Sequence, residues 1–387
     1  MQTLINLFRN NIREYGMIIA LVFITGLFWI LTEGIILKPL NLTNLVLQNG
    51  FILVLAVGMV LVIIAGQIDL SVGSVVAFIG AIAGVLMINN NVPVWLAVIL
   101  SLLVGAVIGV WQGFWIAYVG IPAFIVTLAG MLIFRGLTLW LLDGKSLAPF
   151  PDVFPKLSSG FIPDIGAGDF HILTMILSVV LSLVLIYLEF KKRKTQMQYN
   201  FDVVPMWITG AKLALLVFVI NWFAYQLALN KGLPIVLVIV FVLIAIYTFV
   251  MNNTVMGRHI YATGGNKKAA DLSGIKTKRV VFWVFVNNGV IAALAGLMFA
   301  ARLNSATPAA GNMLELDAIA AVFIGGASMA GGVGTVIGAI VGGLVMGVMN
   351  NGMSLIGIGI DWQQAIKGMV LLLAVGFDVF NKNRAGK

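Results

Sequence analysis

A chain of 387 residues that is 61% hydrophobic and only 10% charged lies outside the composition of soluble proteins and needs hydrocarbon as its main solvent. Its apolar runs are about 18 to 25 residues long, which suits membrane-spanning helices and excludes a barrel of short alternating strands. The net charge of +9 is not a nucleic-acid footprint, because no basic stripe is interleaved with aromatic residues, and the lack of cysteine excludes disulfides, thiolate catalysis and cysteine metal sites. The sequence therefore predicts an all-α polytopic membrane protein.

About twelve hydrophobic segments follow one another along the chain, and we expect them to form membrane spans. Glycine and proline mark several boundaries, as where Gly120 precedes Pro122. Glycines four residues apart, such as Gly105 and Gly109, predict that helix backbones approach closely. Full crossings by 49–66, 71–88 and 317–331 stay open, because a short polar stretch separates the first two and the third is short. The segments lie at about residues 17–37, 49–66, 71–88, 94–118, 122–142, 171–190, 210–229, 233–251, 280–301, 317–331, 333–350 and 363–381.

Basic residues fall unequally on the two sides of a chain that crosses at every segment. Most of the 23 Lys and Arg residues lie on the side of the two termini, including the run at 191–194 and the charges between 258 and 279. Because cytoplasmic loops carry the excess of basic residues, we expect both termini in the cytoplasm. The other side receives a loop at 143–170 that is rich in Pro, Gly and Asp. The first apolar run is long enough to be an anchor, so we expect no cleaved signal.

The polar stretch at residues 261–279 carries the signals of a short helix between two spans. Asn266 is suited to cap its start, Gly274 to end it, and Ala269 and Ala270 to give it an apolar side. An amphipathic helix that lies on the bilayer surface would have the same pattern. A helix that docks on a partner protein is the alternative, and these residues by themselves leave both open.

Residues that could carry catalysis are scarce. The chain has only two histidines, its acidic residues are scattered, and it lacks the GxxxxGK[ST] motif of nucleotide-binding loops. We therefore predict no catalytic residues, no metal site and no cofactor. A carrier driven by protons or sodium would need several buried carboxylates, and only Asp69 and Asp317 are suitably placed. If the chain moves a solute, we expect the energy to come from outside the chain.

Uncharged polar side chains cluster within or beside the predicted spans. Amides donate and accept hydrogen bonds, so a cavity lined with them suits a neutral polyol, but hydrogen bonds between helices account for the same residues. Asp69 offers a similar choice: it can cap the helix that follows it, or it can act at a gate between Gly66 and Gly73. The candidate pathway or gate residues are Gln67, Asp69, Ser71, Asn287, Asn288, Asn350 and Asn351.

Three separated stretches resemble one known family, in the order that the family has them. They are GMVLVIIAGQIDLSVGSVVAFIGA, GGNKKAADLSGIKTKRV and AAVFIGGASMAGGVGTVIGAIVGGLVMGVMNNG. Nearly the whole chain is similar to the permease subunits of bacterial ATP-binding-cassette importers for monosaccharides, and most similar to the longer xylose-type or multiple-sugar members. The resemblance implies one transmembrane permease domain over residues 1–387, made of a ten-span core and an insertion at 190–251 with two further spans.

The same resemblance implies partners and a location. The chain would form the path for xylose or a related sugar across the bacterial cytoplasmic membrane, beside a second copy of itself, a separate ATPase subunit and an extracytoplasmic sugar-binding protein. It would not hydrolyse ATP. A permease for another small polar solute, and a channel or flippase without ATP coupling, remain alternatives. The cytoplasmic loop at 258–279 would dock on the ATPase subunit, although Lys268 stands where the better-known loop has Glu, and the docking residues would be Gly265, Asn266, Ala269, Ala270, Asp271 and Gly274.

Overall fold

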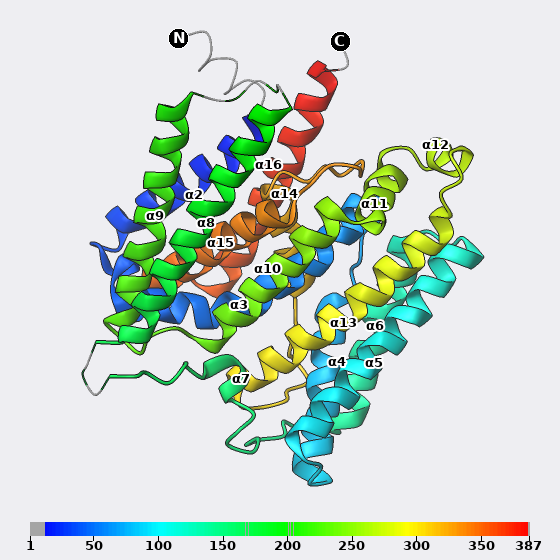
Figure 1. Ribbon diagram of the computed structural model, residues 1–387. Coiled ribbons are helices and arrows are strands. Elements are labelled where there is room, and N and C mark those ends of the chain that lie inside the picture. Colours follow the sequence, from blue (N-terminus) through cyan, green and yellow to red (C-terminus); the bar gives the residue numbers. More distant parts are fainter. Residues whose placement is uncertain are drawn as a thin grey trace.

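The computed structural model describes residues 12–166, 168, 170–199, 201, 203 and 205–385, and over these residues the chain is a bundle of helices without a β-strand (Figure 1). π-helical turns extend two of the helices, α4 to Asn89 and α5 to Val119. The helices are α2 (Ile12–Leu31), α3 (Pro39–Ile64), α4 (Val72–Gly84), α5 (Val94–Phe114), α6 (Ala123–Leu142), α7 (Lys156–Ser159), α8 (Ile172–Gln198), α9 (Met206–Ala228), α10 (Ile235–Asn253), α11 (Val255–Gly265), α12 (Lys267–Leu272), α13 (Thr277–Leu303), α14 (Leu314–Ile324), α15 (Val336–Leu355) and α16 (Ile360–Ala385).

Ten of the described helices are long and apolar enough to cross a membrane, which confirms the predicted fold class. The apolar part of α2, Gly16–Leu31, is shorter than these ten. The predicted segment at 317–331 is not one helix. Its helix, α14, has 11 residues and is about 16 Å long, roughly half of a hydrocarbon core. It ends where Gly325 and Gly326 follow, the second with a φ of +83°.

Helices α3, α13 and α15 form the centre of the bundle. In its most apolar stretch α3 is 94% buried, and α13 packs against α3, α4 and α5. The predicted close approach of backbones is seen between α5 and α13, where a Cβ on Gly105 would lie 2.6 Å from the carbonyl oxygen of Gly289. Such crossings are common in membranes, because the hydrophobic effect does not drive apolar helices together in lipid. Close packing of the helices has to provide the attraction instead.

The expected insertion at residues 190–251 covers the end of α8, all of α9 and most of α10. Helices α8 and α9 pack mainly on each other at the edge of the bundle. Helix α10 instead packs against α3, and its buried Val236 lies against Gly50. The assignment of this segment as an insertion stays a prediction.

The two ends of the bundle differ. Helix α12, the start of α2 and the end of α16 lie at one end (Figure 1). The segment at 143–170, which includes α7, lies at the opposite end. The short helix predicted at residues 261–279 is therefore on the same end as both described ends of the chain.

Candidate functional site

Helix α12 projects from one end of the bundle (Figure 1). The side-chain Oδ1 of Asn266 caps it by accepting a hydrogen bond from the backbone N–H of Ala269 at 3.0 Å. Gly274 follows the helix with a φ of +83°, a conformation that favours glycine. The hydroxyl of Thr277 donates to Asp271 Oδ1 at 2.6 Å and so ties α12 to the start of α13. The start and the end that the sequence predicts for this helix are both confirmed.

The faces of α12 are unequal. Ala270 is buried against the rest of the chain, whereas Leu272 is 91% exposed at the end of the helix. Lys267 and Lys268 are also exposed, as are Gly265 and Ala269. The helix thus presents an apolar tip with basic neighbours to whatever lies beyond this end of the molecule.

Two breaks in the helical structure lie against the end of α11. One, at residues 65–71, joins α3 to α4, and the other, at 325–335, joins α14 to α15. Irregular backbone at membrane depth is tolerated where the protein itself satisfies the free N–H and C=O groups. Both breaks contact the end of α11, the helix that leads directly into α12.

We name this contact the glycine junction, formed by Ile64, Gly264 and Gly332 with Tyr261 and Gly334. The backbone N–H of Gly332 donates to the carbonyl oxygen of Ile64 at 2.8 Å, so the two breaks are joined. The backbone of Gly264 fits against both, because a Cβ there would collide with Ile64 O and lie 2.7 Å from Gly332 N. The Tyr261 hydroxyl donates to Gly334 O at 2.8 Å. Because Gly264 contacts both breaks through backbone atoms, a movement of α11 would push directly on both breaks.

The first break holds a buried polar network around Asp69. One oxygen of Asp69 accepts from the backbone N–H of Ser71 at 2.8 Å and from its hydroxyl at 2.6 Å. The other accepts from Asn288 Nδ2 at 2.7 Å, which links the break to α13. Gln112 of α5 donates to the Ser71 hydroxyl at 2.6 Å. The N-cap of α4 is Ser71, which makes no side-chain cap hydrogen bond, so the expectation that Asp69 caps this helix is wrong. Asp69 instead bonds Ser71 and Asn288, and through Ser71 and Gln112 the network joins the first break to α13 and α5.

The other candidate pathway residues are not brought into this network. Gln67 lines a separate cavity of about 250 Å³ together with Lys267 and Lys278, near α12. Asn287 accepts a short hydrogen bond from the Tyr247 hydroxyl of α10.

Asn351 exchanges hydrogen bonds with Asn41 at 2.8 and 3.2 Å. In this arrangement, Asn287 and Asn351 serve as hydrogen-bonding partners between helices rather than as parts of one cavity.

The sequence analysis did not predict that Asp317 pairs with Lys367. Lys367 of α16 donates to Asp317 Oδ2 of α14 at 3.0 Å, and both side chains lie inside apolar helices. Arg135 of α6 likewise donates to backbone oxygens of Pro308 and Ala310, at 3.1 and 2.6 Å. The only sequence signal was a charged residue within an apolar run, and charge alone does not tell which partner it meets.

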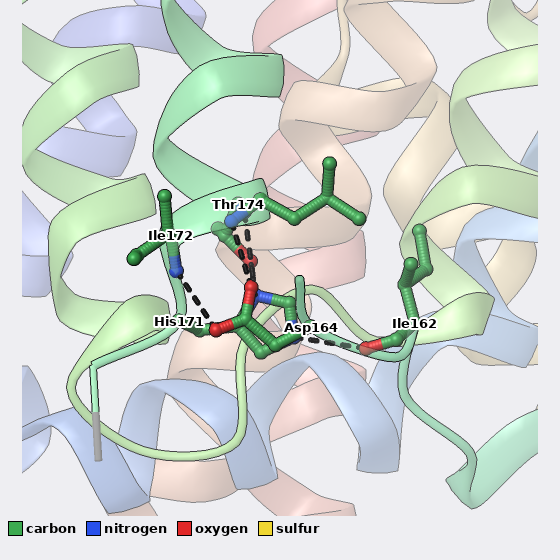
Figure 2. Close-up of polar contacts among 6 residues, drawn as sticks. Ile162, Asp164, His171, Ile172 and Thr174 are labelled. Atoms are coloured by element: carbon green, nitrogen blue, oxygen red, sulfur yellow. Dashed lines mark hydrogen bonds and ion pairs between the residues drawn. The ribbon is translucent and has the colours of Figure 1, made fainter. Parts of the chain in front are cut away.

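At the opposite end, Asp164 secures the start of α8 (Figure 2). Its oxygens accept from the backbone N–H groups of Ile172 at 3.1 Å and Leu173 at 2.9 Å. The Leu173 bond is the largest cause of a lowered pKa for Asp164. His171 Nε2 lies 2.9 Å from the carbonyl oxygen of Ile162 and so donates to it, which leaves Nδ1 to accept from Thr174 N at 3.3 Å. These bonds hold the segment at 143–170 to the start of α8.

Comparison with known proteins identifies the family. Residues 41–375 match the family described as branched-chain amino acid transport system / permease component. The chain belongs to this permease family. It is similar to the xylose transport system permease protein XylH of Haemophilus influenzae, with 38% identity over 97% of this chain and 98% of the relative. The XylH protein of Escherichia coli K12 is 36% identical over 97% of this chain and 94% of its own length.

More distant relatives carry a different sugar in their names. The ribose import permease protein RbsC of Haemophilus influenzae is 33% identical over 87% of this chain and 84% of the relative. No solved structure matches the permease. The resemblance to monosaccharide permeases drawn from the sequence motifs is thereby confirmed.

Proposed function

We propose that this chain is the membrane subunit of an ATP-driven importer and forms the path of a monosaccharide, xylose first among them, across the cytoplasmic membrane. The observation that carries the proposal is the likeness to proteins named as xylose permeases over 97% of the chain. Helix α12, capped by Asn266, followed by Gly274 and projecting from the bundle, supports the ATP-driven part, because a membrane span has no need of such a helix. The chain itself is not an enzyme in this account, and ATP hydrolysis belongs to a partner subunit.

The ATPase subunit docks on α12 in this proposal. The exposed Leu272 offers an apolar anchor, and the neighbouring lysines suit a groove with an acidic rim. The predicted contact residues are Gly265, Asn266, Ala269, Asp271 and Gly274, whereas Ala270, also predicted, is buried within this chain and packs α12 onto it. Movement of α12 passes through α11 and the glycine junction to the two breaks, and from the first break to the network around Asp69. The end that carries α12 and both described ends of the chain then faces the cytoplasm, in keeping with its basic residues.

The opposite end is assigned to the extracytoplasmic sugar-binding protein. The segment at 143–170 lies there and is held to α8 by Asp164, which gives a partner a defined surface. A second copy of the chain completes the path. Among the residues whose burial the structure describes, none in the most apolar stretch of α16 is buried within one chain, which leaves this helix available for such a contact. Residues 190–251 are proposed as an insertion, of which α9 lies at the edge of the bundle.

Cross-linking tests the proposed docking directly, because the chain contains no native cysteine. A Leu272→Cys variant, co-expressed with the ATPase subunit, is expected to form a cross-link to it with a short thiol-reactive linker. Leu372→Cys is the control: Leu372 is also exposed but lies on α16, away from α12. Cross-linking at neither position, with both proteins present in the membrane, would contradict the docking site.

Uptake of a panel of labelled monosaccharides, in cells that lack and then regain the gene, tests the substrate. Restored uptake of xylose or another monosaccharide is the expected result. Restored transport of only an unrelated solute, or transport that persists without ATP, would favour a different permease or a channel.

A further inference from the structure

A cavity of about 260 Å³ lies between α14 and α16, around the Asp317–Lys367 pair. In α16 its lining begins with the first turns, which lie at the end of that helix farther from α12 (Figure 1). Small-molecule sites in proteins measure about 300–1,000 Å³. This cavity is just below that range, so its size suits a single sugar ring rather than a disaccharide. Its polar lining is Asn312, Asp317, Gln363, Gln364 and Lys367, and much of the remainder is apolar, including Met313, Leu316 and Leu371.

Hydrogen-bonding capacity in this cavity is only partly used. Asp317 is 4% exposed, and while its Oδ2 accepts from Lys367, its Oδ1 has no hydrogen-bond partner among the described residues, although the Asn350 amide lies near. An ammonium group has three donors, and Lys367 uses one of them on Asp317. Gln364, also in the lining, is exposed and adds a donor and an acceptor.

A buried acceptor without a partner is costly, and a charged pair inside a membrane protein usually marks a functional place. An ion pair that only anchored α16 to α14 would not require a cavity beside it or a free carboxylate oxygen. Each hydroxyl of a sugar donates one hydrogen bond and accepts others. Such a ligand therefore matches a carboxylate oxygen, an ammonium group and an amide placed together, while its C–H groups match the apolar wall.

We propose that this cavity binds a monosaccharide during its passage, with Asp317, Lys367 and Gln364 as the hydrogen-bonding groups. The assignment rests on the proposed function, since it names a place where the transported sugar is held. It differs from the residues suggested by the sequence alone, most of which bond to other helices or to the network around Asp69.

Thiol labelling in native-like membranes tests the site without depending on transport. Gly368 lines the cavity and a Cβ there meets no atom within 4 Å, so the Gly368→Cys side chain fits at the edge of the ligand space. Gly210→Cys is the matched control, because a Cβ at Gly210 also meets no atom within 4 Å, and Gly210 is exposed on α9 and does not line the cavity. Both variants are treated with a maleimide in the presence of D-xylose or of sucrose at equal osmolarity.

At a xylose concentration of about four times Kd, alkylation of Gly368→Cys is expected to slow about fivefold relative to sucrose, because only the unoccupied fraction reacts. The rate at Gly210→Cys should not change. Adding Asp317→Asn to the Gly368→Cys variant should remove the protection. The same substitution in the Gly210→Cys background should leave the labelling rate there unaltered, which is the check on folding.

Equal rates in xylose and sucrose at Gly368→Cys would overturn the site, and so would equal protection at both positions, which would indicate a change throughout the protein. The two proposals fail in different ways. A wild type that imports no monosaccharide with its ATPase partner refutes the proposed function, whereas normal import without protection at Gly368→Cys refutes only this binding site.

Discussion

Substituting Gly264 tests whether the glycine junction links α12 to the two breaks in the helical structure. In an ordinary helix, alanine is favoured over glycine by up to about 1 kcal/mol, and Gly264→Ala would stabilise α11 if nothing stood in the way. Here the new Cβ collides with the carbonyl oxygen of Ile64 and lies 2.7 Å from Gly332 N. Backbone atoms cannot rotate aside, so we expect an overpacking penalty of about 1–3 kcal/mol that exceeds the helix gain.

The neighbouring Gly265 supplies the control. It ends the same helix, but a Cβ there meets no atom within 4 Å, so Gly265→Ala should leave the free energy of unfolding unchanged or raise it slightly. Thermal melting of the purified proteins measures stability, and uptake per folded molecule measures coupling. We expect Gly264→Ala to melt earlier and to transport poorly while Leu272→Cys cross-linking to the ATPase persists.

A milder variant guards against loss of folding. Tyr261→Phe removes only the hydrogen bond to Gly334 O, a loss of about 1 kcal/mol, and should lower uptake without preventing membrane insertion. The reasoning is refuted if Gly264→Ala and Gly265→Ala behave alike in both stability and uptake.

Three further outcomes are expected. Gly274→Val places a β-branched residue at a φ of +83°, so uptake and transport-stimulated ATP hydrolysis should fall together at normal membrane levels; unchanged uptake would contradict a shaped docking helix. Asp69→Leu leaves three buried donors without their acceptor, at a cost of about 1–3 kcal/mol each, and should not fold stably. Asp69→Asn keeps an acceptor for Ser71 if the Asn288 amide turns over, so this variant should fold and transport. A folded Asn variant without uptake would indicate a gate that needs the charge. Asp164→Ala should lower the melting temperature at neutral pH. Because the folded pKa of Asp164 lies below its unfolded value near 3.9, the difference in melting temperature from wild type should persist down to about pH 4 and shrink as the pH falls further. A difference that already shrinks between pH 7 and 6 would point to a histidine instead.

Local signals were sufficient to predict α12. A capping side chain at Asn266 and a terminating glycine at Gly274 act within a few residues of the helix that they bound, so neither needs knowledge of the rest of the fold. Most long spans were placed by hydropathy for a related reason, since length and apolar character alone meet the demands of the bilayer.

Features that depend on packing were not accessible in this way. Helix α3 begins at Pro39 and not near residue 49. Hydropathy misses this first part because its polar residues Asn41 and Asn49 are buried by protein and not by lipid. The small residues after Ile324 keep the hydropathy high although the helix has ended, so α14 was read as longer than it is. The pairing of Asp317 with residue 367 joins positions fifty apart, and only the fold places them together.

The central claim is that ATP hydrolysis outside this chain drives a monosaccharide through it, and transport in proteoliposomes tests this most directly. The permease, its ATPase subunit and the sugar-binding protein are reconstituted with ATP on the side of α12, and uptake of labelled D-xylose is followed. We predict uptake that requires both hydrolysable ATP and the binding protein, and that is lost in Gly264→Ala but retained in Gly210→Ala, where the new Cβ is exposed on α9 and meets no atom within 4 Å. Xylose entry at the same rate with a non-hydrolysable analogue, or no monosaccharide entry with all three components present, would contradict the account.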